Sequence, residues 1–264
     1  MKLVRTGKIS YLQPAALATG LTAGFSTRNG GVSRPPYHSL NLGTNTEDIQ
    51  AHVEGNRSTF VRAFDLPLHQ LLTVKQVHGN DLLLIDEANL DLSHFARVEV
   101  DAIVTNQPGI MIGILTADCY PLLLWNKQQT AIAAIHIGWR GAAGGLIYKT
   151  IKAMTTHFDC GPEDLVAAIG PGIGADNYEV DRPVRDAFRQ GSGFWNEISQ
   201  ETSLGHWHLN LARSCRLQLE QAGLKPDDIE ESGYCTLTQA EMFFSYRRDH
   251  GKTGRQIGFI MLNS

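Results

Sequence analysis

Short apolar runs, many of them ending in a cluster of glycines, follow one another along most of this chain. The glycine clusters lie at 28–31, 78–80, 138–145, 170–174 and 250–254. Glycine adopts the backbone conformations of tight turns at little cost, so an apolar run that ends in glycine is typical of a buried strand followed by a sharp turn. The pattern predicts a core built from many short strands rather than from a few long helices.

The strands that we expect outnumber the helices. Strands are expected at 22–27, 71–77, 82–86, 100–104, 110–117, 121–125, 131–137, 165–170, 177–180, 233–236, 242–246 and 256–262. Helices are expected at 47–64, 143–158, 182–190 and 209–222. Several of the strands are separated by turns of hairpin length, which argues against a purely parallel sheet. We therefore predict an α+β fold with mixed sheets.

The composition excludes several classes of protein. Hydrophobic residues make up 42% of the chain and charged residues 19%, which does not fit a disordered protein. No apolar run approaches the roughly 20 residues that span a bilayer, and the first residues do not resemble a secretory signal. The net charge of −4 argues against general binding of nucleic acid. We expect a cytoplasmic protein with neither a membrane nor a nucleic-acid partner.

Two histidines and one cysteine stand at the ends of predicted strands, next to glycine-rich turns. His78 precedes Gly79, Cys119 ends the run GILTAD, and His136 precedes the cluster at 138–145. The runs 121–125 and 131–135 are joined by a loop that suits a hairpin, which would return Cys119 and His136 to the same end. Cysteine sulfur and histidine nitrogen are the usual ligands of zinc, and three ligands leave one position open.

The same residues also have a plainer interpretation. The four cysteines include no CxxC pair, so we expect free thiols, and an isolated cysteine is often only a small buried residue. Single histidines are likewise often core residues whose ring nitrogens have hydrogen-bond partners within the protein. The residues alone leave both interpretations open.

Basic residues in the glycine-rich loops are candidates for binding an anion. Arg140 directly precedes Gly141 and a predicted helix, whose first amide groups attract phosphate. Gly141, Arg28 and Arg247 are further candidates for a phosphate or substrate site. Each of these arginines could instead fix a loop by pairing with a carboxylate such as that of Asp249.

Seven motifs in a fixed order give this chain a resemblance to a known family. They are FSTRNGGVSRPPYHSLNLG (25–43), KQVHGND (75–81), DAIVTNQPGI (101–110), TADCYPLLLW (116–125), AAIHIGWRGAAGG (133–145), AIGPGIGADNYEV (168–180) and FFSYRRDHGKTGR (243–255). The chain resembles the YfiH/YlmD family, first labelled laccase-like polyphenol oxidases and now regarded as purine nucleoside phosphorylases with adenosine deaminase activity. The resemblance implies one layered α/β/β/α domain over residues 1–264.

The resemblance also implies a metal centre and substrates. Its ligands correspond to His78, Cys119 and His136, which would hold one zinc ion, with copper as an alternative. The substrates would be adenosine, inosine, guanosine and S-methyl-5′-thioadenosine with phosphate, together with hydrolytic deamination of adenosine. We expect these three ligands and Asp118, a candidate proton carrier, to be the catalytic residues. The oligomeric state, monomer or homodimer, stays open.

Two other functions remain. The first is a copper-dependent polyphenol oxidase, as the older family label suggests; copper binds to such ligands more tightly than zinc. The second is a hydrolase that edits cell-wall precursors, with Cys119 as the nucleophile and His136 as the base.

Overall fold

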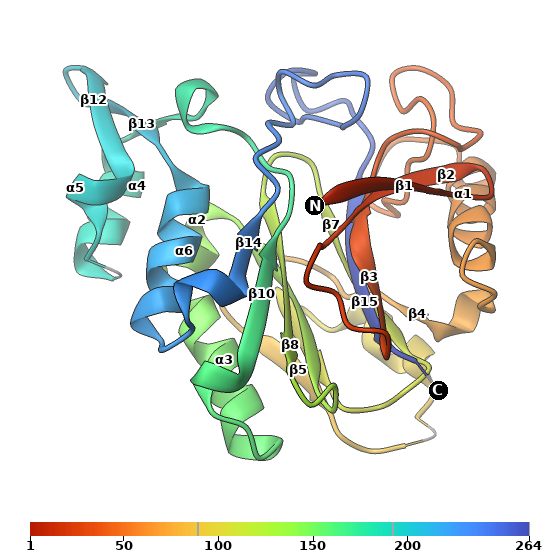
Figure 1. Cartoon of the computed structure of the whole chain (residues 1–264). Helices are drawn as coiled ribbons and strands as arrows, with labels where there is room; N and C mark the ends of the chain where they lie inside the picture. The colour runs from red at the N-terminus through yellow and green to blue at the C-terminus, as the bar shows by residue number, and fades with distance from the viewer. Residues whose placement is uncertain (89, 192, 264) are drawn as a thin grey trace.

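Alternate side chains of the central strands belong to different hydrophobic cores. In β8 (Tyr120–Asn126), Leu122 and Leu124 lie in one core, whereas Leu123 and Trp125 lie in another. Because successive side chains of a strand point to opposite faces, this strand is covered on both sides. The computed structural model, which describes residues 1–88, 90–191 and 193–263, accordingly shows two sheets face to face with helices outside them (Figure 1). The predicted α/β/β/α layering is confirmed.

The first sheet has six strands in the described part of the chain, in the order β1-β2-β3-β15-β7-β4. Their bounds are β1 (Lys2–Thr6), β2 (Ile9–Gln13), β3 (Leu21–Ser26), β15 (Gln256–Leu262), β7 (Met111–Thr116) and β4 (Leu71–Leu72). All neighbours are antiparallel except β4 and β7, which are parallel.

The second sheet also has six strands among the residues described, in the order β14-β10-β8-β9-β6-β5. The strands other than β8 are β14 (Ile229–Glu231), β10 (Leu165–Ile169), β9 (Ile132–Ile137), β6 (Ala102–Thr105) and β5 (Leu82–Ile85). β10 pairs with β14, and β5 with β6, in parallel, while the other pairs are antiparallel. The prediction of mixed sheets is therefore confirmed.

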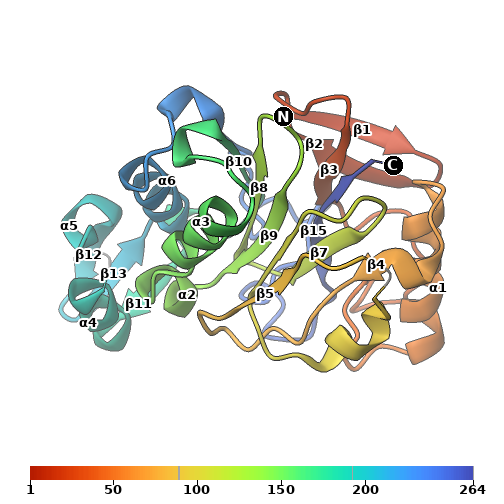
Figure 2. The same cartoon turned by 90° about the horizontal axis from the view of Figure 1, so that it is seen from below.

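Helices cover the outer face of each sheet (Figure 2). On the first sheet, Phe60 and Val61 of α1 (Gln50–Arg62) share a core with Phe259 of β15. On the second sheet, α3 (Leu146–His157) and α6 (Leu211–Gln221) contribute their buried stripes to the core that contains Leu122. In α3 the stripe includes Leu146, Ile147, Ile151 and Met154, as its helical spacing predicts.

Smaller elements complete the fold. A three-stranded sheet is formed by β11 (Glu179–Asp181), β13 (His206–Leu209) and β12 (Ser199–Ser203). The remaining α-helices are α2 (Trp139–Ala143), α4 (Arg182–Gln190) and α5 (Trp195–Ile198). Short 3-10 helices lie at Leu68–Gln70, Leu92–Arg97, Pro162–Asp164, Ala175–Asn177 and Pro226–Asp228.

Two predicted strands, 233–236 and 242–246, are loops. Phe243 and Phe244 are fully buried, which explains their apolar pattern. However, the backbone of Phe244 bonds to the side-chain amide of Gln256 through both its N–H and its C=O, so this amide takes the place of a neighbouring strand. Residues 233–236 make only an isolated bridge, between Cys235 and Gly172.

The predicted strand 71–77 is also shorter than expected, because only Leu71–Leu72 pair as β4. The amides at 77–79 donate to a carboxylate instead of to a strand. The pattern of short apolar runs did not predict β1, β2, β12, β13 or β14, and it missed α2 and α5. Among the described residues, no helix combines the length and the hydropathy needed to cross a membrane.

Candidate metal centre and cavity

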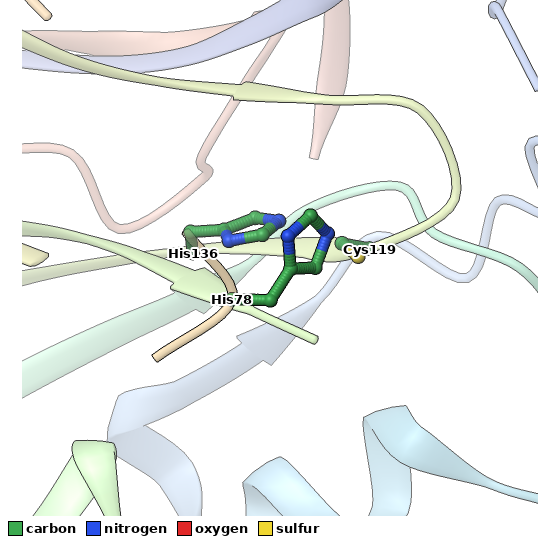
Figure 3. Close-up of side chains that lie close together, drawn as sticks. All are labelled: His78, Cys119 and His136. Atoms are coloured by element: carbon green, nitrogen blue, oxygen red, sulfur yellow. The ribbon is translucent and has the colours of Figure 1, made fainter. Parts of the chain in front are cut away.

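The hairpin formed by β8 and β9 brings Cys119 and His136 to the same end of the second sheet. His136 is opposite Pro121 in the register of the two strands, and Cys119 comes just before β8. His78 arrives from the loop after β4, where its backbone has a φ of +59°. The two ring nitrogens and the sulfur lie within 4.8 Å of one another. Figure 3 shows the three side chains side by side, each on a separate segment.

A single buried carboxylate orients both histidines. Asp101 accepts hydrogen bonds from the backbone N–H groups of Val77 (3.2 Å), His78 (3.0 Å) and Gly79 (2.6 Å). Its Oδ1 also lies 2.7 Å from Nδ1 of His136. An ionised carboxylate can only accept a hydrogen bond, so Nδ1 of His136 carries a proton. Nε2 is therefore the ring nitrogen that can bind a metal ion. The sequence analysis did not identify Asp101 as a functional residue.

Without a metal, Cys119 and His136 favour each other's charged forms. Burial alone would raise the pKa of the Cys119 thiol. The neighbouring His136 and His78 lower it by more than burial raises it, so the pKa is about 6. Burial lowers the pKa of His136, whereas Cys119 and Asp101 raise it to about 9. A thiolate near neutral pH is the form of cysteine that binds a metal.

The space between the three side chains fits a metal ion. Gly138 lies next to them: a Cβ atom at this position would be 3.4 Å from the sulfur of Cys119 and 3.3 Å from Cδ2 of His78. A larger residue would therefore crowd the cluster. Two imidazoles and one thiolate are a donor set that suits zinc and also copper.

The cluster lies in a cavity of about 590 Å³ between the ends of the two sheets. The wall includes apolar residues such as Val74, Leu115 and Ile173 as well as polar ones. His136 is almost fully buried, while His78 is exposed, so the cluster is open toward the cavity on the side of His78. A concave site in which apolar side chains alternate with several converging polar and charged groups suits a small polar molecule.

Asp118 lines the cavity, but its carboxylate is already engaged. Its Oδ1 accepts from the hydroxyl of Thr236 at 2.6 Å, and its Oδ2 accepts from the backbone N–H of Arg247 at 2.7 Å. Its carbonyl oxygen accepts from the N–H of Ile173. Asp118 has a φ of +90° and directly precedes Cys119, so these bonds fix the turn that presents the thiol. Its expected role as a proton carrier stays a prediction.

The predicted anion-binding residues are divided between two places. Arg140 and Arg247 line the cavity, where their guanidinium groups lie over the rings of Trp139 and Tyr178, at 4.3 and 5.6 Å from the ring centroids. Arg28 does not line it. Its side chain donates to the carbonyls of His38 and Ala240 and stacks on a phenylalanine, so it connects loops.

Gly141 also lies outside the cavity wall. It is buried where α2 meets the loop after β4, and an added Cβ would lie 3.1 Å from the carbonyl oxygen of Gly79. Its lack of a side chain lets these two segments approach each other. The structure therefore gives Gly141 a clear packing role and no contact with the cavity.

Sequence reasoning missed several residues of the wall. Tyr178, Tyr246 and Arg255 line the cavity, as does the turn formed by residues 43–45. The two tyrosines and Arg255 fall inside the motifs described above, and Thr44 and Asn45 directly follow the first motif. Tyrosines and a single arginine within glycine-rich loops are, however, common surface residues. Only the fold, which brings these distant segments to one cavity, distinguishes them.

The layered sheets and the His-Cys-His cluster together define a class of protein. It is a layered α+β protein with three potential metal ligands in a cavity lined by arginines. Comparison with known proteins leads from this class to a family. Residues 22–263 match the family described as multi-copper polyphenol oxidoreductase laccase. The chain belongs to this family.

Curated relatives and solved structures agree with this assignment. Purine nucleoside phosphorylase YfiH of Escherichia coli is 38% identical over 92% of this chain and 94% of its own. Purine nucleoside phosphorylase YlmD of Bacillus subtilis is 33% identical over 90% of this chain and 87% of its own. The crystal structure of the Bacillus licheniformis hypothetical protein YfiH covers 97% of both chains, at 30% identity and a TM-score of 0.90.

Proposed function

We propose that this protein is a zinc-dependent purine nucleoside phosphorylase that also deaminates adenosine. The observation that carries the proposal is an open His-Cys-His cluster in a cavity that also presents arginine side chains. The names of the relatives support nucleosides and phosphate as substrates. For this chain we propose adenosine, inosine, guanosine and S-methyl-5′-thioadenosine.

His78, Cys119 and His136 would hold the ion. When bound, zinc supplies Lewis-acid stabilisation of negative charge beside the substrate. Asp101 keeps the ring of His136 in the tautomer that binds through Nε2, and it fixes the backbone on both sides of His78. Gly138 keeps the centre free of a side chain that would fill it.

In phosphorolysis, an oxygen of phosphate forms a bond to the anomeric carbon of ribose while the bond from that carbon to purine nitrogen breaks. The electron pair goes to the purine, which then accepts a proton, and ribose 1-phosphate is the other product. The guanidinium groups of Arg140 and Arg247 at the cavity wall would attract the phosphate. We propose Asp118 as the proton carrier, which would require one of its two hydrogen bonds to open.

In deamination, water replaces the amino group at C6 of adenosine, so that inosine and ammonia are formed. The product distinguishes this reaction from phosphorolysis, because deamination gives inosine and phosphorolysis of adenosine gives adenine. Both reactions would need the same three ligands, because one cluster of this kind is found among the described residues.

Two rival functions each have one observation in their favour. The family description names a copper oxidoreductase, and the donor set accepts copper. A low thiol pKa next to His136 would also suit a cysteine nucleophile in a hydrolase of cell-wall precursors. Phenol oxidation in proportion to bound copper, without nucleoside turnover, would support the first rival. Activity that survives a chelator, with an adduct on Cys119, would support the second.

The test is purification without added metal, followed by metal analysis and identification of products from adenosine with and without phosphate. We expect about one zinc per chain, adenine and ribose 1-phosphate with phosphate, and inosine without it. Cys119→Ala should lose the metal and both activities, while Cys160→Ala, at a buried cysteine that belongs neither to the cluster nor to the cavity wall, should retain them. Normal phosphorolysis by the Cys119 variant would contradict the proposal.

A further inference from the structure

Arg255 is held rigidly in the wall of the cavity by contacts along its whole length. Its backbone N–H donates to the side-chain oxygen of Asn41 at 2.9 Å, and its carbonyl accepts from the N–H of Leu42 at 3.0 Å. The stem of the side chain passes directly over Gly43, where an added Cβ would lie only 2.7 Å from Cγ of Arg255. This arginine is therefore ordered before any ligand arrives.

One edge of the Arg255 guanidinium is bound to protein. Nη1 donates to the carbonyls of Thr253 and Gly254, both at 2.9 Å, and the group lies 5.7 Å from the ring centroid of Tyr246. Nε and Nη2 donate no hydrogen bond to the described residues, and no carboxylate of the described chain forms an ion pair with the group. Burial lowers the pKa of Arg255, as expected for a positive charge without a partner carboxylate.

Arg248, seven residues earlier, shows what a structural arginine looks like in the same loop. It forms an ion pair with Asp249 through two nitrogens, and it donates to the carbonyls of Thr236, Leu237 and Phe243. Its hydrogen-bonding capacity is used by protein. Arg255 has no such carboxylate, although it is half-buried beside the metal-type centre.

The other two arginines of the wall are less suited to anchor an anion. Arg140 and Arg247 are exposed, whereas Arg255 is half-buried. The attraction between a guanidinium and an anion is stronger where water is partly excluded. Arg255 lines the same cavity as Cys119 and Asp118.

We propose that Arg255 anchors an oxyanion subsite in this cavity, with the polar turn at Thr44 and Asn45 as its second wall. A guanidinium edge with two free donors matches two oxygens of a phosphate dianion. The identification of the ligand as the phosphate co-substrate rests on the proposed function. The subsite itself rests on the geometry of Arg255.

The test is to measure the binding of inorganic phosphate by calorimetry, and its KM in adenosine phosphorolysis, for Arg255→Gln. We expect both the Kd and the KM for phosphate to rise at least tenfold, with the KM for adenosine and the phosphate-free deamination changed less than threefold. Arg5→Gln, at an exposed arginine on β1, is the matched control and should behave like the unaltered protein. Arg255→Lys keeps the charge but loses the paired donors of the guanidinium, so its Kd and KM for phosphate should lie between those of the unaltered protein and those of Arg255→Gln.

The outcomes separate this inference from the proposed function. A phosphate Kd and KM within twofold of the unaltered protein in Arg255→Gln would overturn the subsite while leaving phosphorolysis in place. Phosphate binding that depends on Arg255, in a protein that cleaves no nucleoside, would support the subsite and contradict the proposed function. If Arg255→Gln does not fold, as judged by circular dichroism, the same comparison is made with Arg255→Lys, and unchanged phosphate values there would overturn the subsite.

Discussion

At the scale of single residues, the carboxylate of Asp101 connects two ligands that are far apart in the sequence. It is fully buried, it receives three backbone N–H groups from the loop that carries His78, and it orients His136. A carboxylate in this position fixes the tautomer and raises the basicity of the ligand. The residue is thus suited to position the proposed metal ligands rather than to bind the ion itself.

We predict that Asp101→Asn lowers zinc affinity by roughly 10- to 100-fold, the usual loss when such a partner of a ligating histidine is removed. The amide cannot accept all of the bonds that the carboxylate accepts, so the ring and the loop lose their alignment. Competition with a zinc chelator measures the change. Asp86→Asn, at an exposed position after β5, is the control, and equal affinities in the two variants would refute the role of Asp101.

The ionisation of the cluster gives a prediction for pH. Although burial lowers the pKa of His136, Cys119 and Asp101 raise it to about 9, so without metal Nε2 carries a second proton at pH 7. Zinc needs a neutral imidazole, so binding must release that proton, and the apparent affinity should rise by up to about tenfold per pH unit between pH 7 and 8.5. Cys119, with a pKa of about 6, is already ionised there and adds little to the slope.

This dependence is measurable by calorimetry in buffers with different heats of ionisation, which counts the protons released per zinc. We expect about one proton at pH 7.5. Zinc binding that releases no proton, with an affinity that stays flat over this range, would show that His136 is neutral in the metal-free protein.

At the scale of elements, the sequence predicted best where a segment is buried by neighbours close in the chain. The hairpin that carries Cys119 and His136 was recognised from two apolar runs and a short loop, and the register confirms it. The hairpin β12–β13 was not predicted, because β12 is mostly exposed and β13 is only four residues long, with Trp207 and Leu209 as its only apolar residues. Residues 242–246 were misassigned because burial alone does not show whether the backbone partner is a strand or the side chain of Gln256.

The candidate site was only partly predictable for the same reason. The cysteine and the two histidines stand next to glycine turns, which is a visible signal. Asp101 and Arg255 act through loops that meet only in the folded chain, so no local pattern distinguishes them. Arg28 lies in a loop whose composition is typical of a binding loop, yet its side chain donates to two backbone carbonyls.

The layered arrangement predicts that the outer helix α1 stabilises the fold without shaping the metal centre. Phe60 is fully buried on the outer face of the first sheet, with its ring centroid 5.1 Å from that of Phe259. Phe60→Ala should lower the free energy of unfolding in urea by about 3–5 kcal/mol, as is usual for such a truncation. Leu204→Ala, at a side chain that is 88% exposed, should cost almost nothing.

The zinc affinity of the folded Phe60 variant should equal that of the unaltered protein. A loss of affinity comparable to that expected for Asp101→Asn would show that the outer layer and the centre are coupled through the first sheet.

At the scale of the whole molecule, two of the three proposed ligands lie where the chain crosses from one sheet to the other. His78 lies between β4 of the first sheet and β5 of the second, and Cys119 between β7 of the first and β8 of the second. His136 ends β9, in the second sheet. An ion bound by all three would therefore tie together the segments that join the two sheets.

This position predicts that zinc stabilises the entire fold and not only the cavity. A ligand that binds the native state alone adds about 4 kcal/mol when its free concentration is a thousand times its Kd. For a chain of this size that corresponds to a rise in Tm of roughly 10 °C. The rise is measured by thermal unfolding of the metal-free protein with zinc buffered at increasing concentrations. Cys119→Ala should show almost no rise, because without the thiolate the crossings are no longer joined, whereas Cys160→Ala should show the full effect. An equal rise in the Cys119 variant would mean that zinc acts at another place on the protein.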